Sequence, residues 1–234
     1  MRLSIMRNGP SPYGMTRRAF NTGLALLAAL GVSMTILPAA QAANAPVKLL
    51  ALGDSLTAGY GLPEPQGFAS QLQKALTAKG YAVTVVNAGV SGDTTAGGLA
   101  RLDWALADKP DAALVELGAN DMLRGLDPGA AKANLDAILA KLGERRIPTL
   151  LAGMLASPSL GRPYTERFNG MYPDLAKSHD VPLYPFFLDG VATERTLVQP
   201  DGLHPNAQGV AIIVERILPH VTRLLDSLPT KTGG

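Results

Sequence analysis

The sequence contains no cysteine among its 234 residues. This absence excludes disulfide bonds, thiolate metal sites and a lipid anchor on an N-terminal cysteine. A folded domain in this chain must therefore be stabilised by the burial of apolar side chains. About 190 residues follow residue 45, which is long enough for one domain with a single core.

The first 45 residues contain no aspartate or glutamate. They contain an apolar stretch over residues 23–37, followed by the small-residue string PAAQAANA. Their charged side chains are all arginines, namely Arg2, Arg7, Arg17 and Arg18. A basic start, an apolar centre and a small-residue end are typical of an export signal. We therefore expect residues 1–42 to be removed as a signal peptide, which leaves a periplasmic or secreted protein.

This leader allows more than one interpretation. The string TRRAFN resembles a twin-arginine signal, although adjacent arginines also precede the apolar run of ordinary secretion signals. Translation could begin at Met15 instead of Met1. The competing interpretation is an uncleaved membrane anchor, but Ser33, Thr35 and Pro38 interrupt the apolar run. We therefore expect no stable membrane anchor after cleavage.

Removal of the leader changes the net charge of the protein. The whole chain has 21 Lys and Arg, 19 Asp and Glu and a pI of about 8.9. Because the leader holds four of the basic residues and none of the acids, 17 basic and 19 acidic residues remain, which gives a charge near −2. The basic pI therefore arises from the leader, and we expect no nucleic-acid partner.

The rest of the chain alternates short apolar runs with helical patterns. Runs rich in Val and Leu, typical of strands covered on both faces, occupy residues 47–52, 81–87, 112–117, 149–154 and 181–186. Apolar residues with the spacing of one helix face are Phe68, Leu72 and Leu76; Leu99, Leu102 and Leu106; Leu135, Ile138 and Leu142; and Phe168, Met171 and Leu175. This order predicts a three-layer α/β/α sandwich with a five-stranded parallel sheet, a flavodoxin-like architecture.

We expect one domain over residues 43–228, because the sequence shows no internal repeat, linker or second core. Its last segment, residues 207–228, has a helical pattern that contains Pro219, and this proline should kink or split the helix. The tail at 229–234, with the sequence PTKTGG, is expected to be disordered.

Polar clusters follow four of the predicted strands. GDS ends the first strand, NAGVSGDT the second and GAND the third, and DGLHPN lies in the loop after the fifth. Ligands of open parallel sheets bind outside the carboxyl ends of the strands. Helix capping or turn formation explains each cluster taken singly, Ser55 included, but requires no coincidence of all four at one edge. The coincidence favours a functional site at that edge.

His204 is suited to act as the base for a serine nucleophile, with Asp201 as the acid that orients it. An acid three residues before a histidine can orient the imidazole and stabilise its protonated form, which the candidate nucleophile Ser55 requires. By contrast, His179 lies in a polar turn and His220 follows Pro219, so neither has suitable neighbours for catalysis.

A serine nucleophile also needs donors for the negative charge of a tetrahedral intermediate. The backbone N–H groups of Ser55 and Gly92 and the side-chain amide of Asn120 could converge from three strand ends. Taken alone, Gly92 is explained by a turn and Asn120 by an Asx turn. Together with the Asp201 and His204 cluster, they favour an oxyanion hole.

These residues resemble the four sequence blocks of the SGNH, or GDSL, hydrolases. GDSL holds Ser55, SGDT holds Gly92, GAND holds Asn120, and DGLHP holds Asp201 and His204. The similarity covers essentially all of residues 47–226. It is greatest with the bacterial periplasmic branch of acyl-CoA thioesterases, arylesterases and lysophospholipases, because LALGDSLTAGYGL, VVNAGVSGDTTAGGLARL, VELGANDMLRGL and VPLYPFF extend it beyond the blocks.

The resemblance implies a serine hydrolase that cleaves carboxylic esters and acyl thioesters through an acyl-enzyme. It implies Ser55 as nucleophile, His204 as base and Asp201 as the acid that orients it, with Ser55, Gly92 and Asn120 as the oxyanion hole. It also implies that no metal or cofactor is required. We expect the substrate to be a small-molecule acyl ester or thioester and the protein to be a monomer.

Other functions stay open at this point. Carbohydrate acetylesterases of the same family use the same catalytic residues on short acyl groups. A flavodoxin-like phosphate-binding module would share the fold but would have no use for Asp201 and His204, and an inert binding scaffold is the third possibility. An α/β-hydrolase is disfavoured, because Thr57 ends GDSLT where the G-x-S-x-G turn has glycine.

The sequence specifies the substrate less closely than the reaction. Two loops flank the candidate site, MLRGLDPG after Asn120 and LASPSLGRPYTERFNGMY after the fourth strand. Their apolar side chains could line an acyl groove or simply pack the loops together; they are Met122, Leu123, Leu126, Leu155, Leu160 and Tyr164.

Overall fold

The computed structural model of the protein describes residues 46–229. The expected signal peptide and all but the first residue of the expected tail lie outside the described residues. Within the described part of the chain, no helix combines the length and the apolar character needed to cross a membrane.

A five-stranded parallel sheet forms the centre of the fold. Its strands are β1 (Val47–Gly53), β2 (Val83–Gly89), β3 (Ala112–Glu116), β4 (Thr149–Ala152) and β5 (Leu183–Tyr184), in the spatial order β2-β1-β3-β4-β5. Gly53 at the end of β1 is in register with Gly89 of β2 and Glu116 of β3. The first three strands therefore end at one level, and the predicted five-stranded parallel sheet is confirmed.

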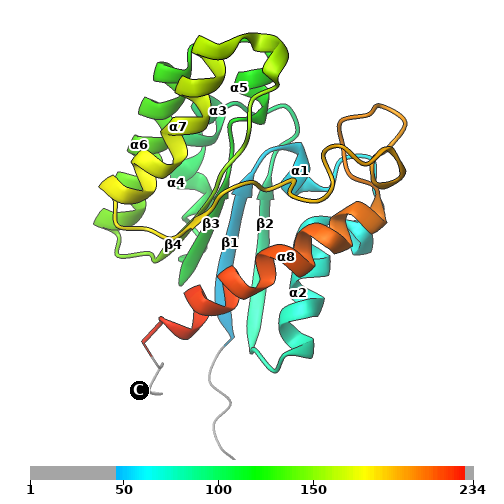
Figure 1. The fold of residues 1–234 in the computed structure, drawn as a ribbon. Coiled ribbons are helices and arrows are strands. Elements are labelled where there is room, and N and C mark those ends of the chain that lie inside the picture. The colour runs from blue at the N-terminus through cyan, green and yellow to red at the C-terminus, as the bar shows by residue number, and fades with distance from the viewer. Residues whose placement is uncertain (1–45, 230–234) are drawn as a thin grey trace, which may run out of the picture. The chain divides into compact units, whose positions relative to one another are not determined.

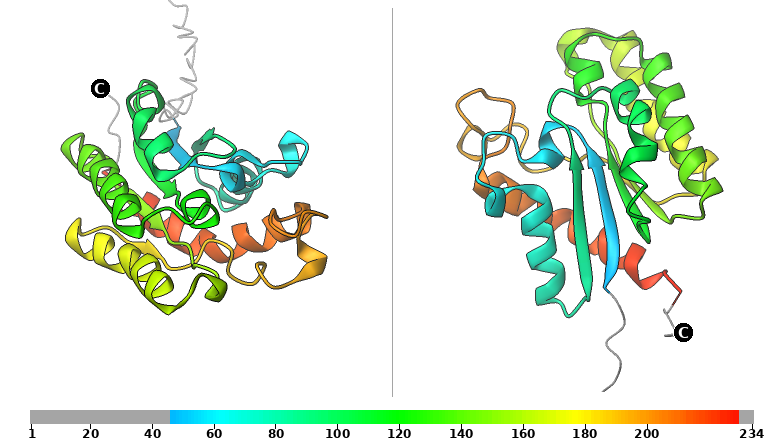
Figure 2. Two further views of the ribbon diagram at one scale, coloured as in Figure 1. Left: turned by 90° about the horizontal axis from the view of Figure 1, so that it is seen from above. Right: turned by 180° about the vertical axis from the view of Figure 1, so that it is seen from behind.

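Helices cover both faces of this sheet, which confirms the three-layer architecture (Figures 1 and 2). One face is covered by α2 (Phe68–Ala78) and α8 (Ala207–Asp226). The other is covered by α3 (Thr95–Ala100), α4 (Leu102–Ala105), α6 (Pro128–Glu144) and α7 (Arg162–Ser178). Two short helices, α1 (Ser55–Ala58) and α5 (Ala119–Leu123), begin where β1 and β3 end.

The core lies between the sheet and its two helical layers. All five residues of β3 and all four of β4 are buried, as expected of strands covered on both faces. The predicted helix faces supply the opposing side chains, and Leu72, Leu76, Leu135 and Leu142 are fully buried. Phe68 meets Phe187 edge to face with ring centroids 5.0 Å apart, so aromatic contacts join α2 to the loop after β5.

The structure differs from the expected elements in the helices. The stripe of Leu99, Leu102 and Leu106 is divided between α3 and α4, because Arg101 leaves the helical conformation between them. Pro219 was expected to kink or split the last helix, and the structure shows that it does not split it, because α8 is one element. Pro219 and Glu215, whose carbonyl loses its helical donor, are both exposed to solvent, so the missing hydrogen bond leaves no buried polar group unpaired.

Candidate active site

The four polar clusters meet at the carboxyl end of the sheet. Ser55 begins α1 directly after β1, Gly92 lies in the loop after β2, and Asn120 lies in the first turn of α5 after β3. Asp201 and His204 lie in the loop that leads to α8. The parallel sheet thus brings together residues that are far apart in the sequence, at the edge that the sequence pattern predicted.

Ser55 is held in a tight turn between β1 and α1, residues 53–59, which we call the nucleophile turn. Asp54 is the N-cap of α1 and accepts a hydrogen bond from Leu56 N at 3.0 Å. A Cβ on Gly53 would lie 2.0 Å from Thr57 Oγ1, so only glycine allows the chain to turn this closely. Capping is therefore carried out by Asp54, and the Ser55 hydroxyl is left for another partner.

That partner is His204. Ser55 Oγ lies 2.9 Å from His204 Nε2, and His204 Nδ1 lies 2.7 Å from Asp201 Oδ2. When Nδ1 carries its proton and donates to Asp201, Nε2 can accept the hydroxyl proton of Ser55. The three side chains thus form a continuous hydrogen-bonded chain from carboxylate to hydroxyl, the geometry of a nucleophile with its base.

Asp201 is fixed by its own loop, residues 198–206, which we call the base loop. Its Oδ1 accepts hydrogen bonds from Leu203 N at 2.9 Å and His204 N at 3.0 Å. These backbone donors, followed by the His204 side chain, lower the pKa of Asp201 from 3.8 to about 2. Asp201 is therefore ionised throughout the neutral range and can stabilise a positive charge on His204.

Two further contacts join the base loop to Tyr60, the residue that follows the nucleophile turn. The side-chain amide of Gln199 donates to Tyr60 O at 2.7 Å and to Pro205 O at 3.0 Å. The Tyr60 ring lies against the His204 ring with centroids 4.6 Å apart. The imidazole therefore has a packing partner as well as hydrogen bonds to orient it.

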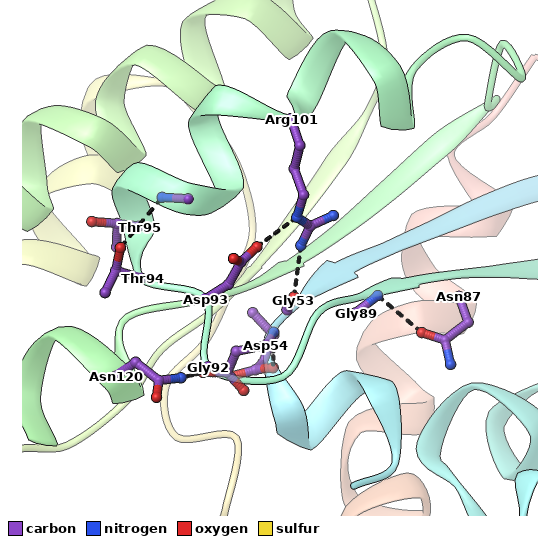
Figure 3. A network of polar contacts seen from close by, with 12 residues as sticks. Gly53, Asp54, Asn87, Gly89, Gly92, Asp93, Thr94, Thr95, Arg101 and Asn120 are labelled. Atoms are coloured by element: carbon purple, nitrogen blue, oxygen red, sulfur yellow. Dashed lines mark hydrogen bonds and ion pairs between the residues drawn. The ribbon is translucent and has the colours of Figure 1, made fainter.

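Gly92 and Asn120 lie beside the nucleophile turn (Figure 3). Gly92 has φ +85°, a left-handed conformation that glycine adopts without strain. Asn120 donates from Nδ2 to Asp54 Oδ2 at 3.1 Å, and Nδ2 carries a second hydrogen that this bond does not use. Figure 3 shows the Asn120 side chain reaching toward Asp54 next to Gly92.

Two carboxyl groups of the site are completely buried, namely those of Asp54 and Glu116. Burial, more than any other cause, raises the pKa of Asp54 from 3.8 to about 6. Burial, followed by the charge of Asp54, raises the pKa of Glu116 well above its usual range. Thr57 Oγ1 donates to Glu116 Oε2 at 2.8 Å. Sequence reasoning assigned no role to Glu116, although it is an acid inside the apolar run AALVEL and lies in the stretch VELGANDMLRGL that extends the family resemblance.

A groove of about 1060 Å³ opens beside Ser55, Asn120 and His204. Of the six predicted groove residues, Met122, Leu123, Leu155 and Leu160 line it. The other two do not: Tyr164 stacks on Phe168 with centroids 6.0 Å apart, and Leu126 is exposed outside the groove. Sequence reasoning missed four further lining residues, which lie in the segments after β4 and β5: Met154, Phe186, Leu188 and Ala192.

None of the described residues that line this groove is Asp, Glu, Lys or Arg. An uncharged groove of this size is suited to an apolar chain whose polar end lies at Ser55. Within residues 46–229, no cluster of three or more His, Asp or Glu side chains is placed to hold a metal ion.

The other two histidines lie away from this edge. His179 Nε2 lies 2.7 Å from Asp136 Oδ1 at the end of α7. His220 lies on α8 with its ring 5.0 Å from that of Tyr184. The structure brings neither of them to Ser55.

Comparison with known proteins gives consistent matches. The model of the GDSL-like Lipase/Acylhydrolase family matches residues 51–212. Esterase TesA of Pseudomonas aeruginosa is 41% identical over 178 residues, which cover 76% of this chain and 89% of that protein. Thioesterase 1/protease 1/lysophospholipase L1 of Escherichia coli K12 is 40% identical over 168 residues, which cover 71% and 79%.

The fold is similar to solved structures as well. The crystal structure of AlinE4, an SGNH-hydrolase family esterase, matches with a TM-score of 0.65 and 48% sequence identity. The match covers 77% of this chain and 97% of AlinE4. The resemblance noted from the sequence blocks is thereby confirmed.

Proposed function

Because the chain belongs to the GDSL-like lipase/acylhydrolase family and is a serine hydrolase of the esterase and thioesterase type, we propose that Ser55, His204 and Asp201 are its catalytic triad. The observation that carries the proposal is the hydrogen-bonded chain from Ser55 Oγ to His204 Nε2 and from His204 Nδ1 to Asp201, at 2.9 and 2.7 Å. Its substrates are small-molecule esters.

In the first half of the reaction, His204 Nε2 takes the proton of the Ser55 hydroxyl while Oγ attacks the acyl carbon. The backbone N–H groups of Ser55 and Gly92 and the amide of Asn120 donate to the resulting oxyanion. The intermediate collapses, the bond to the leaving oxygen or sulfur breaks, and His204 returns the proton to the leaving group. Ser55 then carries the acyl group as an ester.

In the second half, water replaces the leaving group. His204 removes one proton from water, the hydroxide oxygen attacks the acyl carbon, and the same donors hold the oxyanion. Breakdown releases the carboxylic acid and returns the proton to Ser55. Asp201 stays ionised throughout and stabilises the protonated imidazole.

The acyl chain of the substrate occupies the groove, and its length is medium to long. The support for this is the groove's volume of about 1060 Å³ and its apolar, uncharged lining. Each buried CH₂ contributes about 0.8 kcal/mol, or close to a fourfold gain in kcat/KM. Oxygen esters and thioesters are both cleaved, because the oxyanion is the same for either leaving atom.

The test is a kcat/KM series for p-nitrophenyl esters and acyl-CoA thioesters from two to sixteen carbons. We expect both series to rise and then reach a plateau, and Ser55→Ala to abolish both together. Ser178→Ala, an exposed serine on α7, is the matched control. Activity retained in Ser55→Ala would reject the triad, and a preference for acetyl over all longer chains would indicate a carbohydrate acetylesterase.

A groove-filling variant tests the acyl site separately. Ala192 is exposed and lines the groove, so Ala192→Trp should lower kcat/KM for chains of twelve or more carbons and leave acetyl esters unaffected. Ala133→Trp, at an exposed position on α6, is the control for adding an indole. An equal loss at all chain lengths would place the acyl chain elsewhere.

Residues 1–42 direct export and are removed, and the mature domain acts in the periplasm or outside the cell as a monomer. The support is the basic leader with its small-residue end, and the origin of all triad and groove side chains in one chain. Mass spectrometry of periplasmic protein should find an N-terminus near Ala43. Light scattering should give the molar mass of a single chain. An intact leader in the membrane fraction would contradict export.

A further inference from the structure

The two backbone N–H groups proposed as oxyanion donors follow different strands. Ser55 N–H follows β1, whereas Gly92 N–H lies in the loop after β2. Donors of an oxyanion hole act only when both lie within hydrogen-bond distance of one oxygen, and an error of about 1 Å can cost on the order of 100-fold in rate. The loop that carries Gly92 must therefore be fixed relative to β1.

The backbone fixes this loop on the side that precedes Gly92. Val90 N donates to Gly53 O at 3.0 Å, and Asp93 N donates to Val90 O at 3.1 Å. Residues 90–93 thus close a tight turn with Gly92 at its third position, where φ +85° is typical of a type II turn. Gly92 N–H belongs to the central peptide of that turn, whose direction reverses between type I and type II turns.

The side chain of Arg101 fixes the loop on the side that follows Gly92. Its Nε donates to Asp93 Oδ2 at 2.5 Å, and its Nη2 donates to Gly53 O at 2.8 Å (Figure 3). One planar guanidinium thereby joins the residue after Gly92 to the residue two before Ser55. Lysine, with a single nitrogen, cannot reproduce this fixed two-point geometry.

The Arg101–Asp93 pair is shielded from solvent. Both side chains are only 17% exposed, whereas the Arg145–Asp103 pair has side chains 45% and 63% exposed. Asp93 also packs closely on α3, since a Cβ on Gly97 would lie 2.6 Å from Asp93 Oδ1. A shielded, charge-assisted pair holds its geometry better than a surface pair, which salt and side-chain entropy weaken.

We propose that Arg101 is a positioning residue for the oxyanion hole, which sets Gly92 N–H relative to Ser55 N–H by joining Asp93 to the carbonyl of Gly53. The inference rests on the proposed function and adds a residue outside the triad and the hole itself. Arg101 acts through Asp93 and the backbone and has no contact with the acyl group.

The test uses Arg101→Lys, Arg101→Gln, Asp93→Asn and the double variant Asp93→Asn/Arg101→Gln, with Arg145→Gln as the matched surface control. Five quantities are measured for each: kcat and KM for p-nitrophenyl octanoate, the thermal unfolding midpoint, and one Ki for each of two ketones. An octyl trifluoromethyl ketone adds to Ser55 and forms an oxyanion, whereas the corresponding methyl ketone binds the groove without forming one.

We expect kcat to fall about 10- to 100-fold in Arg101→Lys and Arg101→Gln, with KM within about twofold of the wild type. Ki for the trifluoromethyl ketone should rise by a similar factor, and Ki for the methyl ketone should not change. The double variant should lose little more than either single variant, because both members act through one contact. Arg145→Gln should match the wild type.

A structural role would give another pattern. A lower unfolding midpoint with a parallel loss of affinity for both ketones, failure of all the variants to fold, or wild-type kcat in Arg101→Gln would each overturn the inference. Ser55→Ala separates this result from the proposed function. If Ser55→Ala is inactive while Arg101→Gln retains full kcat, only the role of Arg101 is rejected, and if Ser55→Ala is active, the proposed function itself fails.

Discussion

Asp54 in the nucleophile turn and Asp201 in the base loop form the same local motif in opposite surroundings. Each accepts a hydrogen bond from the backbone N–H two residues later, Leu56 N at 3.0 Å and Leu203 N at 2.9 Å. Asp54 is completely buried, whereas Asp201 is exposed at the rim of the site. The pKa of Asp54 is raised to about 6 and that of Asp201 is lowered to about 2.

The difference shows which effect dominates at each position. Backbone hydrogen bonds stabilise the charged form in both cases, but at Asp54 the loss of hydration is larger than this gain. Asp201 is therefore a permanent negative charge next to His204. Asp54 holds two donors, Leu56 N and Asn120 Nδ2, at the cost of a buried carboxyl group close to Glu116.

The largest effect is expected from Asp201→Asn. The amide keeps the size of the side chain but removes the charge and can present a donor to His204 Nδ1, which favours the wrong tautomer. We expect kcat to fall by about 10²- to 10⁴-fold with little change in the unfolding midpoint, since Asp201 is exposed. Asp174→Asn, at an exposed acid paired with Lys132, is the control. A loss below about tenfold would contradict the role of Asp201.

Asp54→Asn should have a smaller kinetic effect. The introduced amide can still cap α1 with its carbonyl oxygen, but its NH₂ group would then face the NH₂ group of Asn120. Asn120 should lose its orientation, which lowers kcat about 10- to 100-fold and weakens trifluoromethyl ketone binding in parallel. Unchanged kcat would show that Asn120 is oriented without Asp54.

Glu116→Gln should alter stability more than activity. The pKa of Glu116 is raised in the folded protein, so between about pH 4.5 and its folded pKa the folded state binds more protons than the unfolded state. This group's contribution to stability therefore decreases as the pH rises through that window. Gln keeps an acceptor for Thr57 Oγ1 and cannot ionise, so the decrease should become smaller.

The measurement is urea unfolding of Glu116→Gln and the wild type at pH 5 and pH 8. The stability of the variant relative to that of the wild type should be greater at pH 8 than at pH 5, because only the wild type must ionise a buried carboxyl group. Glu166→Gln, at an exposed glutamate paired with Arg162, should show no such change. A variant that is destabilised equally at both pH values would mean that Glu116 stabilises the fold as an ionised group.

The smallest effect is expected at Tyr60. Its ring packs against His204, while the Gln199 contact is to its backbone carbonyl, which no substitution removes. Tyr60→Ala should lower kcat by about two- to fivefold through a less ordered imidazole, on the order of 0.5 to 1 kcal/mol. Tyr60→Phe keeps the ring and should match the wild type. Equal losses in both variants would show that the hydroxyl group matters instead of the ring.

Much of the fold was predictable because local sequence patterns specify its strands and helices. The apolar runs identified all five strands, and the three- and four-residue spacings identified α2, α6 and α7. The expected last strand, residues 181–186, is reduced to Leu183–Tyr184, because Pro182 and Pro185 flank it and lack the N–H that a ladder requires. The sequence likewise did not show that Pro219 faces solvent, where the helix continues past it without being split.

The candidate site was predictable in its motif residues and not in its surroundings. Short motifs and the strand-end rule brought Ser55, Gly92, Asn120, Asp201 and His204 together. Glu116 and Arg101 lie in stretches that extend the family resemblance, but neither belongs to one of the four blocks. Both were missed, because their contacts with the distant nucleophile turn are not visible in the sequence. The groove was partly predicted, since the loops after Asn120 and after β4 were recognised but Met154 and the lining residues in the loop after β5 were not.

By itself, the sequence determined the order of strands and helices along the chain and the edge of the sheet where polar residues gather. It also determined the family to which the chain belongs. Those features depend on periodicity and on short motifs, which neighbouring residues specify. Only the tertiary structure decided which carboxyl groups are buried, how Arg101 joins two strand ends, and which side chains line the groove. The hydrogen bonds of the site join residues as far apart in the sequence as Ser55 and His204, which are separated by 149 positions. The burial of its carboxyl groups, and therefore their pKa values, follows from packing across the whole domain.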